Sequence, residues 1–254
     1  MSSVQADKQF TRRLAWAEIL AALVIFQFYI WVILPLAGDR FWAWMLLVGL
    51  ATSGSYLFLV SPRIWQFIGA HKLIANHSIG GSRLLADLPF YAVATVLAGL
   101  FIFLLSLLTN PNWNGVDTST LATGALRYLS LAAIQVGFYY VFIYPRLKVA
   151  ISSDSVSDWR PVILMAAIFS LCHVPNVALM LGGSVIAFAW TWVYQRRPNL
   201  LLLCSSHMVL GTLLVVVAKV PTRVGHAYFE QDFWPFRLAL AIAWNDVSTI
   251  WFIY

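Results

Sequence analysis

Residues 160–213 read RPVILMAAIFSLCHVPNVALMLGGSVIAFAWTWVYQRRPNLLLLCSSHMVLGTL, and this stretch decides how the rest of the chain is interpreted. It holds three apolar segments and two histidines, His173 and His207, where a lipid bilayer would favour hydrocarbon. A strongly polar side chain in the bilayer core costs roughly 2.5 kcal/mol or more unless it faces the protein interior and has partners. Two such residues in one short region indicate a candidate site.

The whole chain has the composition of a multi-pass membrane protein. Apolar residues make up 61% of its 254 residues, charged residues only 10%, and its mean hydropathy is +0.80. About a quarter of the residues of a soluble domain are charged. We therefore expect an all-α, polytopic transmembrane helix bundle of about eight helices, with residues 1–254 forming a single integral membrane domain.

The expected helices fall into three parts of the chain. Residues 1–123 hold three helices and their loops, residues 124–217 hold four core helices, and residues 218–254 hold a loop and a last helix. The expected bounds are about 14–36, 41–60, 84–108, 124–144, 160–173, 177–194, 199–217 and 236–254. Pro145 is expected to end the fourth helix, and the last segment is either a span or an interfacial helix.

The distribution of charge favours one orientation and argues against nucleic-acid binding. With the N-terminus inside, 11 of the 16 Lys and Arg residues fall on the cytoplasmic side, so both termini are expected to be cytoplasmic. The cations are scattered singly and form no basic stripe. Glu18 is expected at a solvated helix start, and Asp87 in a first turn, where a carboxylate favours the helix dipole.

The spacing of residues around the two histidines allows both to face one site. Phe169 and His173 are four residues apart, as are His207 and Gly211, so each pair shares a helix face. If the two helices pack side by side, both imidazoles converge on one pocket. The flanking candidates are Ser205, Ser206 and Asn176 as hydrogen-bond partners, and Gln135, Tyr139 and Tyr140 from the fourth helix. The alternative is two separate core histidines whose hydrogen bonds join helices.

No cofactor or metal is expected from the sequence. Two histidines can ligate zinc, but a catalytic zinc needs a third protein ligand and the sequence places none. Cys172 and Cys204 both fall in apolar segments, where small buried hydrophobes are the favoured interpretation and a disulfide is not.

Two short motifs in order resemble a known family. Phe169-Ser170-Leu171-Cys172-His173, followed by Pro175 and Asn176, resembles the FxxxH motif of the CAAX-processing and bacteriocin-processing intramembrane protease family, called CPBP or Abi. His207 to Gly211 is similar to the family's HxxxN motif, with Gly211 where asparagine is usual. The resemblance implies a CPBP-like core in the C-terminal two-thirds of the chain, and family positions for His173 and His207.

The family's first motif, EExxxR, is replaced in this chain. Aligning its end on Pro145-Arg146-Leu147 sets Gln135 and Val136 on the paired glutamates and Tyr140 on the arginine. The resemblance implies that a glutamate activates water for attack on a peptide bond while the histidines stabilise the oxyanion. An amide cannot take a proton from water near neutral pH, so Gln135 keeps the shape of the base without its chemistry.

These features lead to two functional hypotheses. The first is a non-proteolytic membrane protein acting as a binding, scaffold or accessory subunit, in contact with the bilayer, a membrane-protein partner, or an isoprenoid, lipid or pigment. The second is an intramembrane endopeptidase that processes a prenylated or leader-peptide substrate through His173 and His207. A transporter is disfavoured because no helix carries a charged relay. The resemblance implies a bacterial inner membrane.

Overall fold

The computed structural model describes residues 3–33, 40–70, 72, 83–109, 118–153, 155–218, 220, 224 and 225. It is an all-α polytopic bundle, as the sequence predicts. Its α-helices are α1 (Ser3–Phe28), α3 (Arg40–Ser55), α4 (Ser61–Phe67), α6 (Leu84–Thr109), α7 (Thr118–Val136), α8 (Tyr144–Ala150), α9 (Arg160–Leu171), α10 (Val177–Arg196) and α11 (Leu200–Thr212). Its π-helical turns are η1 (Tyr29–Ile33), η2 (Tyr56–Val60), η4 (Gly137–Ile143) and η5 (Leu213–Val217).

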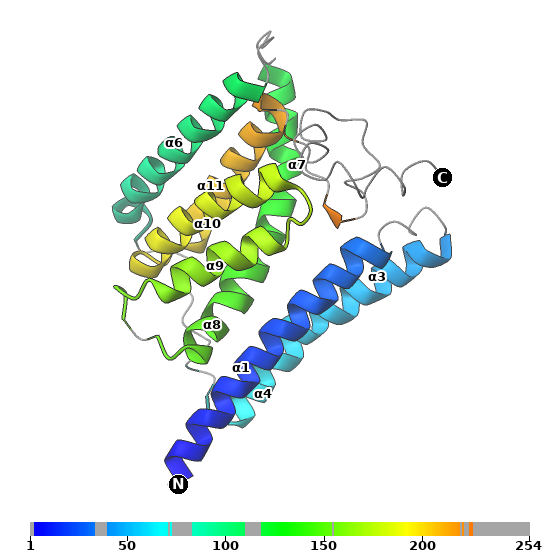
Figure 1. Cartoon of the computed structure of the whole chain (residues 1–254), viewed down its shortest axis with the longest axis vertical. Helices are drawn as coiled ribbons and strands as arrows, with labels where there is room; N and C mark the ends of the chain where they lie inside the picture. Colours follow the sequence, from blue (N-terminus) through cyan, green and yellow to red (C-terminus); the bar gives the residue numbers. More distant parts are fainter. Residues whose placement is uncertain are drawn as a thin grey trace, which may run out of the picture.

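Helices α1, α3 and α4 lie together along one side of the molecule, and α6 to α11 form the bundle on the other side (Figure 1). Within the bundle, α11 packs against both α6 and α7, and α10 packs against α9 and α6. Helix α1 reaches the bundle mainly through α8. The last turn of α1 also contacts the bundle, because Gln27 Nε2 donates to the backbone oxygen of Leu171 at 2.9 Å.

Five helical segments in the described residues are long and apolar enough to cross a membrane. They are 8–33, 84–104, 122–150, 177–196 and 200–217. Helix α9 is also apolar but has only 12 residues, and it ends two residues before the expected end at His173. At 1.5 Å per residue it is about 18 Å long, shorter than a bilayer core of ~30 Å. The expected eighth helix, 236–254, lies outside the described residues.

The fourth expected helix is longer than the sequence predicts, and Pro145 does not end it. The helix runs from α7 through η4 into α8 and stops at Ala150. Pro145 lies in the first turn of α8, directly after the π-helical turn η4, so the change of helix type falls at the proline. The second expected helix, 41–60, is also too short, because residues 61–67 continue as helix α4, likewise with a proline in its first turn.

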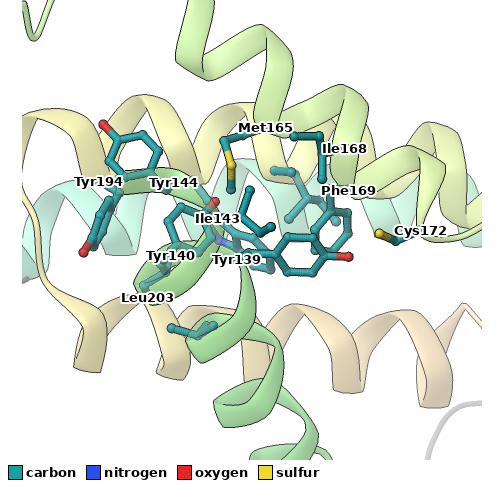
Figure 2. Close-up of a cluster of buried hydrophobic side chains, with 14 of the residues drawn as sticks. Tyr139, Tyr140, Ile143, Tyr144, Met165, Ile168, Phe169, Cys172, Tyr194 and Leu203 are labelled. Atoms are coloured by element: carbon teal, nitrogen blue, oxygen red, sulfur yellow. The ribbon is translucent and has the colours of Figure 1, made fainter. Parts of the chain in front are cut away.

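Aromatic side chains form much of the core between η4, α8, α9 and α10. Figure 2 shows Tyr140, Tyr144 and Tyr194 gathered at one end of a buried cluster, with Tyr139 beside Phe169 at the other end. The Tyr139 and Phe169 ring centroids lie 4.8 Å apart, and those of Tyr140 and Tyr194 lie 5.0 Å apart. Tyr139 and Phe169 lead into the candidate site described next.

Candidate functional site

His173 lies just past the end of α9, and its position is fixed by its own helix. Its ring centroid is 4.7 Å from that of Phe169, one turn earlier. Its Nδ1 lies 2.6 Å from the backbone oxygen of Phe169. A carbonyl oxygen only accepts, so Nδ1 carries the proton and donates this hydrogen bond. In the neutral ring, Nε2 of His173 is then left as an acceptor.

His207, in α11, is almost fully buried, with 4% of its surface exposed. Three aromatic rings surround its imidazole, those of Trp190 at 4.5 Å, Tyr128 at 5.9 Å and Phe169 at 6.2 Å between centroids. Among the described residues, no hydrogen bond joins a nitrogen of His207 to the protein. Phe169 therefore contacts both imidazoles, and His207 keeps its nitrogens for another partner.

The two histidines line one cavity of about 1010 Å³. It lies between the N-terminal helices and the bundle, and its wall also includes Gln135, Tyr139, Phe169 and Gly211. The convergence that the helical spacing predicts is thus present in the structure. Most of the remaining wall is apolar, with Ile25, Phe26, Leu50, Leu57, Ile134, Phe138, Leu179 and Ile186 among its side chains.

Gln135 lines the cavity between Tyr128, which contacts His207, and Tyr139, which contacts Phe169. Tyr128, Gln135 and Tyr139 are seven and four residues apart on the α7–η4 helix, and all three line the cavity. Oε1 of Gln135 is buried and has no hydrogen-bond partner among the described residues. The amide therefore has unused hydrogen-bonding capacity in an apolar cavity.

Two residues expected at the site point elsewhere. Tyr140 faces away from the cavity, and its hydroxyl lies 3.0 Å from Oγ1 of Thr191. Asn176 is the N-cap of α10, where its Oδ1 accepts a hydrogen bond from the backbone N–H of Leu179 at 3.1 Å. Both are buried, but their resolved hydrogen bonds hold the fold together and do not reach the imidazoles.

The serines expected to bond the imidazoles join helices or bond within one helix. Trp190 Nε1 donates to Ser206 Oγ at 2.8 Å, and the hydroxyls of Ser206 and Thr95 lie 2.6 Å apart. Ser206 thereby connects α11 to α10 and α6. Ser205 donates to the backbone oxygen of Leu201 in its own helix and is exposed.

Gly211, where the family usually has asparagine, is covered by an aromatic ring. A Cβ at this position would overlap the ring of Tyr128. The same ring contacts His207. Tyr128 therefore fills the space beside the second histidine that a longer side chain at Gly211 would need, a contact that sequence spacing could not reveal.

The prediction that Glu18 lies at a solvated helix end is wrong. Glu18 is 4% exposed, sits deep inside α1, and lines the same cavity as the histidines. Its carboxylate accepts hydrogen bonds from four side chains on η2, α4 and α8. They are Tyr56 at 3.1 Å, Ser61 at 2.6 Å, Trp65 at 2.8 Å and Arg146 at 2.5 Å.

Arg146 contacts η4 as well as the Glu18 carboxylate. Its guanidinium also donates to the backbone oxygen of Phe142 and lies 3.8 Å from the Phe142 ring centroid.

Asp87 lies in the first turn of α6, as expected, and it is buried. Asn199 Nδ2 lies 3.4 Å from its Oδ2, and Arg197 Nη1 lies 3.8 Å from its Oδ1.

In the described part of the chain, no group of three or more His, Cys, Asp or Glu residues could hold a metal ion.

Comparison with known families supports the resemblance seen in the motifs. Residues 137–213 match the family model described as type II CAAX prenyl endopeptidase Rce1-like. The match begins two residues after Gln135 and ends two residues after Gly211. No curated protein and no solved structure matches the chain.

Proposed function

We propose that this protein, whose residues 137–213 match the CAAX endopeptidase family, is a non-proteolytic membrane protein that binds an apolar chain in its central cavity. The observation that carries the proposal is that the described wall of the cavity offers no available base. Gln135 stands where the family has a glutamate, and among the described wall residues the only carboxylate is that of Glu18. Four donors engage that carboxylate.

The chemistry of Glu18 argues against a role as general base. A base must take a proton from water as the nucleophile attacks. Hydrogen bonds to the ionised form and an adjacent cation both favour the charged carboxylate, so they oppose its protonation. Protonating Glu18 would also leave the Arg146 charge unpaired in the interior, which costs several kcal/mol.

The size and the apolar wall of the cavity favour binding of an apolar chain. Its volume of about 1010 Å³ is at the upper end of the range of roughly 300–1,000 Å³ for small-molecule sites. Side chains from α1, α3, α7 and α9 to α11 line it, and most are apolar or aromatic. A lipid-like chain or an apolar segment of a membrane partner suits such a wall. In this function the protein acts as a binding or accessory subunit in the membrane.

A cleavage assay and a binding assay together test this proposal. The purified full chain is incubated with a prenylated CAAX peptide, alone and beside the variants His173→Ala and Glu18→Gln. We expect no cleavage by any of them. Cleavage by the natural chain that either substitution abolishes would overturn the proposal and establish the rival, an endopeptidase that uses Glu18 at a distance.

The binding assay measures labelling of the protein, in nanodiscs, by a photoreactive alkyl chain. Gly54 lines the cavity, and a Cβ there would meet nothing within 4 Å, so Gly54→Trp fills space without a collision at Cβ. We expect it to reduce labelling of the cavity wall. Val209→Trp is the control, because Val209 is 40% exposed on α11, a position suited to contact with lipid. Equal labelling of the natural chain and Gly54→Trp would contradict binding in the cavity.

A further inference from the structure

The polar groups of the cavity gather near the two histidines. Tyr128 contacts His207, and Tyr139 contacts Phe169, whose ring touches both imidazoles. Gln135 lies on the same helix face, between Tyr128 and Tyr139. The amide of Gln135 is therefore at the same level of the cavity as the two imidazoles.

These groups are neutral and lack partners. Oε1 of Gln135 is unpaired, Nε2 of His173 is an acceptor in the neutral ring, and the nitrogens of His207 bond to no described residue. An amide and a neutral imidazole each combine a donor and an acceptor. A buried group of this kind costs about 1–3 kcal/mol when it stays unpaired. The set suits a ligand group that both donates and accepts.

The charges on the wall exclude an ionised ligand group. Among the described wall residues there is no Lys or Arg, and the one carboxylate, Glu18, is bound by Arg146. A phosphate or carboxylate entering the cavity would find no free cation there. An ammonium group would find no free anion. Burying an unpaired charge in such surroundings is far more costly than burying a hydroxyl group.

We infer that the cavity binds a neutral lipid whose polar group is a hydroxyl, held by Gln135, His173 and His207, with its chain along the apolar wall. This inference rests on the proposed binding function and names the class of ligand. The hydroxyl donates to Nε2 of His173 or to the Gln135 oxygen, and accepts from the amide of Gln135 or from His207. Either orientation of the amide satisfies it.

The test uses competition between probes that share one chain. The full-length protein in phosphatidylcholine nanodiscs is labelled with octadecanol carrying a diazirine in its chain. The competitors are octadecanol, octadecyl sulfate and octadecyltrimethylammonium, which differ only in their polar group. We expect octadecanol to compete at least about tenfold better than either ion. A tenfold difference in affinity corresponds to about the net free energy of one hydrogen bond between neutral groups.

Variants identify the residues that recognise the hydroxyl. Gln135→Leu with His173→Phe should abolish the preference for octadecanol, while Ser205→Ala, whose hydroxyl bonds only within α11, should keep it. If the double variant unfolds, Gln135→Met alone should still reduce the preference, because its side chain has nearly the same shape. A melting curve of each variant checks that it is folded.

The outcomes separate this inference from the proposed function. Equal competition by all three probes, with labelling still blocked by Gly54→Trp, would overturn the hydroxyl inference and leave chain binding intact. Stronger competition by either ion would also overturn it. No saturable labelling by any probe would overturn both. A preference for octadecanol that survives the Gln135 and His173 substitutions would show that other residues recognise the hydroxyl, and would overturn the assignment.

Discussion

The Glu18 carboxylate lies 2.5 Å from Nε of Arg146, although 128 positions separate these residues in the chain. Their side chains are 3% and 2% exposed, so water solvates neither charge to any large extent. The pair joins α1 to α8, where the N-terminal helices meet the bundle. This buried salt bridge holds the two parts of the fold together. Arg146 also engages the only carboxylate on the described cavity wall.

Replacing one member of this pair should destabilise the protein strongly. Arg146→Met leaves the Glu18 charge buried without its cation, which costs about 3–5 kcal/mol. We expect a large fall in the melting temperature in detergent. Arg146→Met combined with Glu18→Leu should recover part of the loss, because no charge then remains unpaired. A single variant as stable as the natural chain would contradict the proposed role of the Glu18–Arg146 salt bridge.

The sequence could not predict this pair, and the reason is physical. The apolar run begins near Leu14, so the sequence predicts that the first helix starts there. The helix starts at Ser3, because Lys8, Arg12 and Arg13 are compatible with a helix that extends past the bilayer, so Glu18 lies well inside it. Its partner is distant in the chain, and no local pattern reports such a contact.

The arrangement around the histidines was more accessible to sequence reasoning. Residues four apart share a helix face, so Phe169 with His173 and His207 with Gly211 could be placed, and the structure brings both histidines to one cavity. The ring of Tyr128 over Gly211 could not be foreseen, because it depends on how α7 packs against α11. Tyr140 was misplaced, because spacing alone did not settle which side of the helix meets α10.

Two adjacent glycines in α10 should respond differently to alanine. A Cβ at Gly183 would lie 2.9 Å from the Phe169 ring, whereas a Cβ at Gly182 would meet nothing within 4 Å. Gly183→Ala forces that ring to shift and should cost about 1–3 kcal/mol. Gly182→Ala should be neutral or stabilising by up to about 1 kcal/mol, because alanine favours helix. Melting temperatures of the two variants check the difference.

A reversed order of the glycine variants would contradict the packing of Phe169 against α10. Gly183→Ala should also alter labelling by the photoreactive chain, because Phe169 and Gly183 both line the cavity. Gly182 is not among the wall residues, so Gly182→Ala should leave labelling unchanged and serves as the matched control.

The loop between α8 and α9 should loosen in acid. Hydrogen bonds from the Arg160 guanidinium, with Nη2 2.7 Å from Asp158 Oδ2, hold the pKa of Asp158 well below its usual range. The contribution of the pair is therefore complete above the ordinary carboxyl pKa of about 3.9, and is lost as pH falls through the lower folded value. Hydrogen exchange at 155–160, corrected for intrinsic rates, should show little pH dependence above about pH 5 and faster opening in strong acid.

Asp158→Asn is the control for this acid effect. It removes the charge at every pH, so its loop should open faster than the natural loop at pH 7, and the difference should shrink in strong acid. Gln195 Nε2 donates to the backbone oxygen of Asp158 at 3.0 Å and remains in both proteins. A difference that grows as pH falls would contradict the sign of the shift.

Ser206 should matter for stability far more than its neighbour Ser205. Ser206→Ala leaves the buried indole N–H of Trp190 without its acceptor and removes the hydroxyl contact with Thr95. An unpaired buried donor costs about 1–3 kcal/mol, and hydrogen bonds between membrane helices are worth about 0.6 kcal/mol on average, so we expect a loss of ~1–2 kcal/mol. Ser205→Ala should cost little, because its hydroxyl bonds within its own helix and is exposed. Since Trp190 lies 4.5 Å from His207, a freed indole would also disturb the cavity wall.

Ser206→Ala should therefore reduce labelling by the photoreactive chain as well as the melting temperature. If Ser206→Ala and Ser205→Ala behave alike in both measurements, the hydrogen bond between Ser206 and Trp190 does not hold the cavity wall in place.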